Sequence, residues 1–243
     1  MNNNFALVIP MANEEKDFNI FIEEIKNILS LLGSGKVYFV VDNASVDNTK
    51  KICEDLSFID DRFELIWAPD NKNVVDAYLK GYKVALLNGH DFIIEMDAGM
   101  SHDPRAIPLF LRVLNEGNDC AFGSRFINGG SIQESSRRRT YLSKVGTFVS
   151  NVLLGTNFKD MTSGFQGFHK SIVESFLKTR LHSKAHFYQT ELRYLLREKK
   201  YMEVPIHYRA PSPSVSNKAI LNSLSVLLFY FVSRLTSKNH IIK

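Results

Sequence analysis

Short apolar runs alternate along the chain with longer segments that carry apolar residues at helical spacing. Such runs predict buried strands at residues 5–10, 36–42, 63–68, 91–97 and 119–125. The segments between them have the period of amphipathic helices, at residues 13–33, 45–56, 74–89 and 103–117. Strands that alternate with helices through short connections predict an α/β fold, with a Rossmann-like, mostly parallel sheet covered by helices on both faces.

The pattern changes after about residue 130, where it becomes mostly helical with one late strand at residues 201–208. We expect a catalytic domain over residues 1–210, followed at 211–243 by a loop and an apolar helix. That helix is about 17 residues long and interrupted by polar residues, so it is shorter than a membrane span. Two interpretations stay open: a buried or amphipathic helix, or a helix on a membrane surface with Lys218, Arg234 and Lys238 facing lipid headgroups.

Polar residues gather where the predicted parallel strands end, which is where such sheets bind ligands. Asp42 is placed to accept hydrogen bonds from a base or a ribose, whereas Asp47 is better explained as a helix cap. The chain has neither a G-x-G-x-x-G loop nor a P-loop, which argues against a dinucleotide-binding domain and a P-loop hydrolase. The other polar positions at strand ends are Pro10, Asn13, Asn71, Asp97 and residues 123–125.

The stretch FIIEMDAGMSHDP delivers acidic side chains to the end of one predicted strand. Asp97 ends that strand, and a carboxylate there can bind Mg²⁺ or Mn²⁺ together with a diphosphate. Glu95 alternates with Asp97, so both side chains should project to one face of the strand. Glu95 is therefore either a second metal ligand or a buried structural acid.

Basic residues concentrate in SRRRTYLSK, and Arg125 follows a predicted buried strand. Arginine side chains suit phosphate oxygens. The overall charge of +4 is too small to indicate a nucleic-acid partner, and we expect none. The two cysteines lie in apolar surroundings, which fits a reducing compartment, and the N-terminus lacks the features of a signal peptide.

Several motifs together resemble one family. VIPMANEE, VVDNASVDNT and NKNVVDAYLKG are similar to motifs of the family 2 inverting glycosyltransferases with the GT-A fold. The later segments GSRFINGG, SKVGTFVSNVLLG, DMTSGFQGFHK, FYQTELRYLLREKKYMEVPIHY and SNK resemble the dolichyl- or polyprenyl-phosphate sugar synthases of that family. Their order and spacing agree over roughly residues 5 to 220.

The resemblance implies a role for each matching residue. Asp97 would hold the metal and the diphosphate, and Arg125 would act near the acceptor phosphate. Gly99 departs from the family, which usually has a second aspartate there, and Ser101 stands where a glutamine is common. The remaining implied roles are nucleoside binding by Pro10, Asn13, Glu14, Asp42 and Asn71, and acceptor-phosphate binding by Arg139, Ser143 and Lys218.

The resemblance also implies a reaction. A sugar would pass with inversion from a GDP- or UDP-sugar to a polyprenyl phosphate, with Mg²⁺ or Mn²⁺, on a peripheral protein at the cytoplasmic face of the membrane. If the acceptor is instead a hydroxyl of a glycan or glycolipid, a base is needed, and Glu191 is either that base or a helix residue beside the site. A third hypothesis, which Gly99 supports, is a catalytically silent protein that binds nucleotide-sugars.

Overall fold

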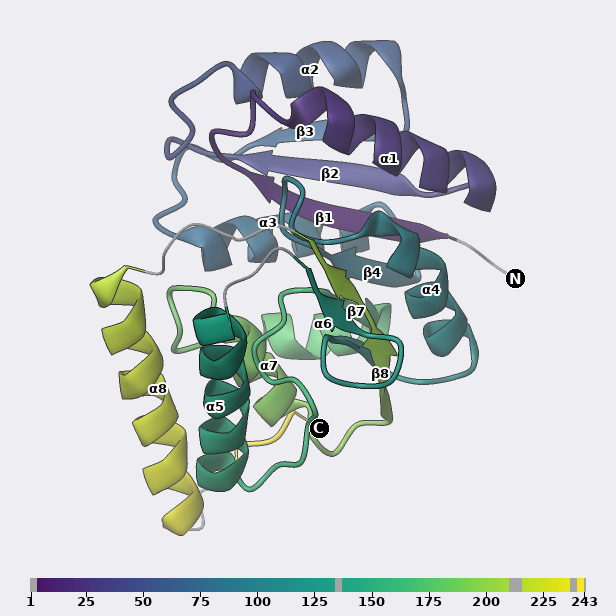
Figure 1. The fold of residues 1–243 in the computed structure, drawn as a ribbon. Coiled ribbons are helices and arrows are strands. Elements are labelled where there is room, and N and C mark those ends of the chain that lie inside the picture. The colour runs from purple at the N-terminus through teal and green to yellow at the C-terminus, as the bar shows by residue number, and fades with distance from the viewer. Residues whose placement is uncertain (1–3, 134–136, 210–215, 237–239, 243) are drawn as a thin grey trace.

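A seven-stranded sheet runs through the molecule and confirms the predicted α/β architecture (Figure 1). The computed structural model describes residues 4–133, 137–209, 216–236 and 240–242. The strands of this sheet are β1 (Phe5–Met11), β2 (Lys36–Val41), β3 (Phe63–Trp67), β4 (Phe92–Glu95), β5 (Cys120–Ser124), β7 (Gln166–His169) and β8 (Tyr201–Pro205). Their order is β3-β2-β1-β4-β7-β5-β8, and all neighbours are parallel except those of β7.

The sequence pattern missed β7, which lies antiparallel between β4 and β5. This strand has four residues, QGFH, and is too short and too polar to show a period. Gln166 faces Glu95 across the ladder, so each polar side chain finds its partner on the other strand. The predicted strand at 201–208 is divided into β8 and β9 (His207–Tyr208), and β9 pairs with β6 (Ser131–Ile132) in a small second sheet.

Helices cover both faces of the main sheet, because alternate strand residues point to opposite sides. In β1, Leu7 and Ile9 face one core layer, while Ala6 and Val8 face the other. The first layer lies under α1 (Phe18–Leu32), α2 (Thr49–Ile59), the 3₁₀ turn η1 (Pro104–Ala106) and α4 (Ile107–Asn115). The second lies under α3 (Val74–Leu87), α6 (Lys170–Leu177) and α7 (Tyr188–Leu195).

The last two long helices, α5 (Arg137–Leu154) and α8 (Asn217–Leu235), lie side by side (Figure 1). Val226, Leu227 and Tyr230 of α8 are buried in the same core layer as α7. This helix therefore packs against the body of the fold. The predicted boundary at residues 210 and 211 lies outside the described residues.

Candidate active site

The loops that follow β1 and β2 are fastened to one another at the carboxyl edge of the sheet. The side chain of Asn13 accepts from the Val46 N–H (3.0 Å) and donates to the Ala44 carbonyl (3.2 Å). Its backbone has φ of 59°, a left-handed conformation that asparagine tolerates better than most residues. The next N–H, of Glu14, donates to Thr49 Oγ1 (2.8 Å). Asn13 thus holds the site together as a link between two loops.

Two more of the predicted nucleoside residues meet at this edge. Asp42 follows β2, and its Oδ1 accepts from the Ala44 N–H (2.9 Å). Its Oδ2 accepts from Asn71 Nδ2 (3.4 Å), which comes from the loop after β3. Pro10 lies in β1, opposite Val40 of β2. The fold therefore gathers these positions at neighbouring strand ends, as the sequence predicts.

Asp97 lies just beyond β4, where its carboxylate is held from one side. Its Oδ1 accepts from the Tyr78 hydroxyl of α3 (2.7 Å). Its N–H donates to His102 Nδ1 (3.3 Å), and the same nitrogen is 3.9 Å from Oδ2. No other described side chain is recorded within hydrogen-bond distance of Oδ2, and the side chain is 31% exposed. One carboxylate oxygen therefore remains open to a ligand.

The surroundings keep Asp97 ionised. Burial alone would raise the pKa of its carboxyl, but two neighbouring histidines and the Tyr78 hydroxyl together lower it below its ordinary value. His102 is buried between the rings of Phe165 and Tyr208, and burial lowers its own pKa.

The chemistry of Asp97, with one oxygen lacking a protein partner, suits a divalent cation. Gly164 packs closely against it, since a Cβ atom on Gly164 would lie 2.9 Å from Asp97 Oδ2 and 2.7 Å from Gln189 Nε2. No group of three or more His, Cys, Asp or Glu side chains placed to hold a metal occurs in the described ranges. The donors present suit a hard cation that takes one or two protein carboxylates and completes its shell with phosphate and water.

The Glu14 carboxylate lies beside Gly99, two residues beyond Asp97. Its half-buried side chain accepts no recorded hydrogen bond from the described part of the chain. Burial is the largest cause that raises the pKa of its carboxyl, and the charges of neighbouring aspartates, Asp97 among them, add to it. The carboxylates of Glu14 and Asp97 are thus close enough to repel one another.

Glu95 is not placed as a metal ligand, and that prediction is corrected here. It is fully buried, and its Oε1 accepts from Gln166 Nε2 (2.7 Å) while its Oε2 accepts from the Tyr188 hydroxyl. Burial raises its pKa to about 8, so the group is mostly protonated near neutral pH. The structure therefore favours the alternative of a buried structural acid.

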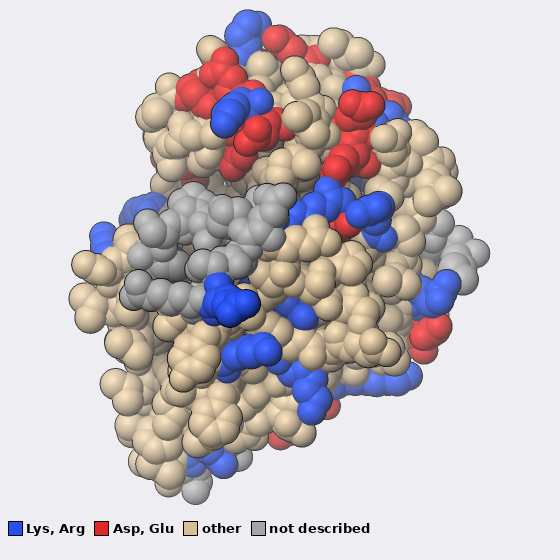
Figure 2. Space-filling model, in the orientation of Figure 1, with Lys and Arg blue, Asp and Glu red and all other residues tan. Residues whose placement is uncertain are grey.

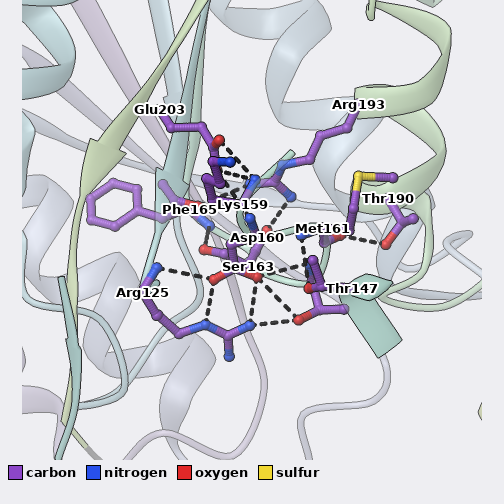
Figure 3. Close-up of polar contacts among 12 residues, drawn as sticks. Arg125, Thr147, Lys159, Asp160, Met161, Ser163, Phe165, Thr190, Arg193 and Glu203 are labelled. Atoms are coloured by element: carbon purple, nitrogen blue, oxygen red, sulfur yellow. Dashed lines mark hydrogen bonds and ion pairs between the residues drawn. The ribbon is translucent and has the colours of Figure 1, made fainter. Parts of the chain in front are cut away.

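Arg125 is largely occupied by an ion pair (Figure 3). Its Nε and Nη2 donate to the two oxygens of Asp160 at 2.7 and 2.8 Å, and Nη2 also donates to Thr162 Oγ1. Burial would raise the pKa of Asp160, but the Arg125 guanidinium outweighs it and holds that pKa below its ordinary value. Within the described chain, Nη1 is the guanidinium nitrogen left without a recorded partner, so only it could meet an acceptor phosphate.

A second buried arginine lies on the other side of Asp160. Figure 3 shows Arg193 of α7 approaching from the side opposite Arg125. Its Nη1 and Nη2 donate to the carbonyls of Ser163 (2.7 Å) and Gly123 (3.2 Å). Burial lowers its pKa to about 10, which leaves it charged at neutral pH. Asp160, the first residue of the segment DMTSG, therefore provides the negative charge between two buried arginines.

Glu191 is placed as an anchor, which corrects the prediction of a catalytic base. It is fully buried, and its carboxylate accepts from the backbone N–H groups of His182 (2.7 Å) and Ser183 (2.9 Å). The Tyr230 hydroxyl of α8 donates to it as well (2.6 Å). These three bonds tie a loop and α8 to α7, and they leave the carboxylate no free access to an acceptor.

The predicted acceptor residues lie on α5 and α8. Ser143 is half-buried on α5, next to Lys144, whose Nζ is 5.6 Å from the centre of the Phe126 ring. The Arg125 guanidinium is 5.2 Å from the same ring, so the basic end of α5 lies near Arg125. Lys218 is exposed in the first turn of α8. Arg139 belongs to α5, but its side chain lies outside the described residues.

Sequence reasoning missed four residues that shape the site. Asp160 and Gly164 were visible inside the motif DMTSGFQGFHK, and His102 stood in the stretch that also holds Asp97. Tyr78 gave no signal, because an aromatic residue at helical spacing is usually a core residue. Only the packing of α3 against the end of β4 brings its hydroxyl to Asp97.

Comparisons with known proteins show the family of this chain. The model of the family described as glycosyl transferase family 2 matches residues 6–177. The polyprenol monophosphomannose synthase of Mycolicibacterium smegmatis is 28% identical over 213 residues, which cover 86% of this chain and 79% of that protein. The dolichol-phosphate mannosyltransferase of Pyrococcus furiosus is 30% identical over 173 residues, 70% of this chain and 47% of that protein.

The fold is shared with a solved enzyme. The glucosyl-3-phosphoglycerate synthase of Mycobacterium tuberculosis, in complex with Mn²⁺, UDP-glucose and phosphoglyceric acid, superposes with a TM-score of 0.67. It is 15% identical, and the match covers 98% of this chain and 80% of that one. The fold is that of the GT-A glycosyltransferases. The chain belongs to glycosyl transferase family 2.

Proposed function

We propose that the protein transfers a sugar from a UDP- or GDP-sugar to a polyprenyl phosphate, with inversion at the anomeric carbon. The relatives named above act, by their names, on polyprenol or dolichol phosphates. The nucleoside would lie between Pro10, Asp42 and Asn71, where three strand ends meet. The diphosphate would lie over Asp97, where a bound Mg²⁺ or Mn²⁺ would neutralise charge that develops on the leaving group.

The reaction forms a bond between an acceptor phosphate oxygen and the anomeric carbon, and breaks the bond from that carbon to the diphosphate. The acceptor is already ionised near neutral pH, since the second pKa of a phosphoester is about 6. It therefore needs no general base. This fits the structure, because Glu191, the acid considered as a base, is buried and hydrogen-bonded.

The observation that best supports a lipid phosphate as the acceptor is the character of the surface formed by α5 and α8. These helices contain no Asp or Glu, and they begin with basic residues. Figure 2 shows acidic side chains concentrated on the upper part of this face, with basic ones across the middle and lower part. The two helices expose large apolar side chains, at Tyr141, Leu142, Phe148, Val149, Val152, Ile220, Leu221, Leu224, Leu228, Phe229, Val232 and Leu235.

An apolar surface rimmed by cations suits the interface of an anionic membrane. Among the described residues, α8 is the one helix that is long and apolar enough to cross a bilayer. Only 22% of its apolar stretch is buried in the protein, so most of that stretch is free to meet lipid. Its other face is bound to the fold, through Tyr230 and through Asn222, whose Oδ1 accepts from the Lys184 N–H (3.0 Å). We therefore place α8 along the membrane surface. The buried free thiols of Cys53 and Cys120 support a reducing, cytoplasmic side.

Nucleoside diphosphate release tests the reaction. Purified protein is incubated with a panel of UDP- and GDP-sugars and Mn²⁺ or Mg²⁺, with a polyprenyl phosphate as acceptor. We expect release from one donor that depends on the lipid and stops with EDTA. The matched control is the same polyprenol without its phosphate, which should not stimulate release because it is not ionised. Stimulation by the alcohol, or by a sugar acceptor alone, would contradict the lipid phosphate.

Vesicle binding tests whether the exposed face of α8 binds to a membrane. The change is Leu221→Glu together with Leu228→Glu, which adds two charges to one exposed face of α8. We expect sedimentation with vesicles of phosphatidylglycerol and phosphatidylcholine to weaken more than about tenfold, since each buried leucine contributes roughly 1.5–3 kcal/mol. Leu87→Glu, at an 85% exposed leucine on α3, is the control and should bind normally. Equal binding of both variants would refute this orientation.

A further inference from the structure

Position 99 lacks the carboxylate that the resemblance leads one to expect, and the structure shows what lies there instead. Gly99 has φ of +74°, in the left-handed region, two residues beyond Asp97. A Cβ atom on it would lie 3.0 Å from Glu14 Oε2 and 3.8 Å from Glu14 Cδ. No other heavy atom outside its two chain neighbours lies within 4 Å of that position in the described structure. The Glu14 carboxylate therefore occupies the direction in which a side chain at 99 would leave the backbone.

The Glu14 carboxylate is also available. Its backbone N–H is fixed by Thr49 Oγ1 (2.8 Å), and the preceding Asn13 is fastened to the loop after β2. The backbone of Glu14 is thus fixed in place. Its carboxylate accepts no hydrogen bond from the described residues. A half-buried carboxylate without a protein donor keeps its oxygens free for water, a cation or a polar ligand. Asp97 Oδ2 is open in the same way.

We propose that Glu14 supplies the second carboxylate of the cation site, from the loop after β1, in place of a side chain at position 99. This inference rests on the proposed function, since the cation is the one that accompanies the nucleotide diphosphate. Two protein carboxylates with phosphate and water match the ligand number that Mg²⁺ takes from proteins. The loss of the aspartate at 99 then leaves a working site rather than a silent one.

The test measures cation binding and not turnover. Mn²⁺ is titrated into the protein with UDP or with GDP at fixed concentration, and unbound Mn²⁺ is followed by electron paramagnetic resonance against a protein-free baseline. We expect Glu14→Gln, which removes the charge and keeps the shape, to weaken Mn²⁺ binding about tenfold or more. Asp97→Asn should weaken it at least as much.

Asp17→Asn is the matched control, because Asp17 has the largest charge effect on Glu14 but lies in the cap of α1. It should change Mn²⁺ binding less than about threefold, as expected for a partly screened charge. If Glu14→Gln binds Mn²⁺ as Asp17→Asn does while Asp97→Asn does not, the inference is wrong and the proposed function stands. If the unaltered protein binds no Mn²⁺ with either nucleotide, both the inference and the metal of the proposed function fail.

A carboxylate swap gives a second test that does not depend on Glu14→Gln folding. Glu14→Ala removes the carboxylate and opens the volume beside Gly99. Adding Gly99→Asp restores a carboxylate, now from the loop after β4. Aspartate tolerates the left-handed conformation of position 99 better than most residues do. We expect the double variant to bind Mn²⁺ several-fold more tightly than Glu14→Ala alone. Equal binding of the two would overturn the proposal.

Discussion

Replacing Asp97 with asparagine should lower kcat/KM for sugar transfer by about a thousandfold, or roughly 4 kcal/mol of transition-state stabilisation. Asp97 is the carboxylate with an open oxygen at the carboxyl end of the sheet, and its lowered pKa keeps it charged. Asparagine keeps an acceptor for the Tyr78 hydroxyl, so the fold should survive. The measurement is nucleoside diphosphate release at several donor concentrations, with the melting temperature as a check on folding.

Asp91→Asn is the control for this prediction. Asp91 immediately precedes β4 at its opposite end, where it pairs with Lys170 on the surface (2.7 Å). Its loss should leave kcat/KM within about twofold, because surface ion pairs contribute little. If Asp97→Asn kept more than a tenth of the original activity, the diphosphate and its cation would have to bind elsewhere.

Asp160→Asn should destabilise the protein by about 3–5 kcal/mol, the cost of leaving a buried charge without its partner. Asp160 is fully buried and makes a two-point ion pair with Arg125, while Arg193 approaches from the other side. Its loss leaves the buried Arg125 guanidinium without its ion-pair partner and removes the largest favourable charge that acts on Arg193. Urea unfolding followed by circular dichroism measures the loss, and the Tm should fall by on the order of 10 °C.

An exposed aspartate serves as the comparison for Asp160. Asp55 pairs with Lys51 one helical turn away in α2 (3.0 Å), and both side chains are more than half exposed. Asp55→Asn should cost less than about 0.5 kcal/mol, since such helical pairs are weak. A loss below about 1 kcal/mol for Asp160→Asn would mean that water or a rearranged side chain neutralises the two arginines.

The sequence by itself determined the layered fold and the edge that carries the site. Alternating strands and amphipathic helices require a covered parallel sheet, and chemistry at strand ends follows from that topology. Asp42, Asn71 and Asp97 could therefore be placed together before any coordinates were known. The order of motifs likewise indicated the family that the comparisons confirm.

Only the tertiary structure decided which acids are free to act. In the sequence, Glu95, Glu191 and Glu14 all stand near predicted site elements. Partners from distant segments make the difference: β7 and α7 supply hydrogen-bond donors to Glu95, while a loop and α8 supply donors to Glu191. Glu14 is left open beside Gly99. Periodicity reports which face of an element is buried, but long-range contacts determine whether a buried carboxylate is satisfied by the protein or remains available to a ligand.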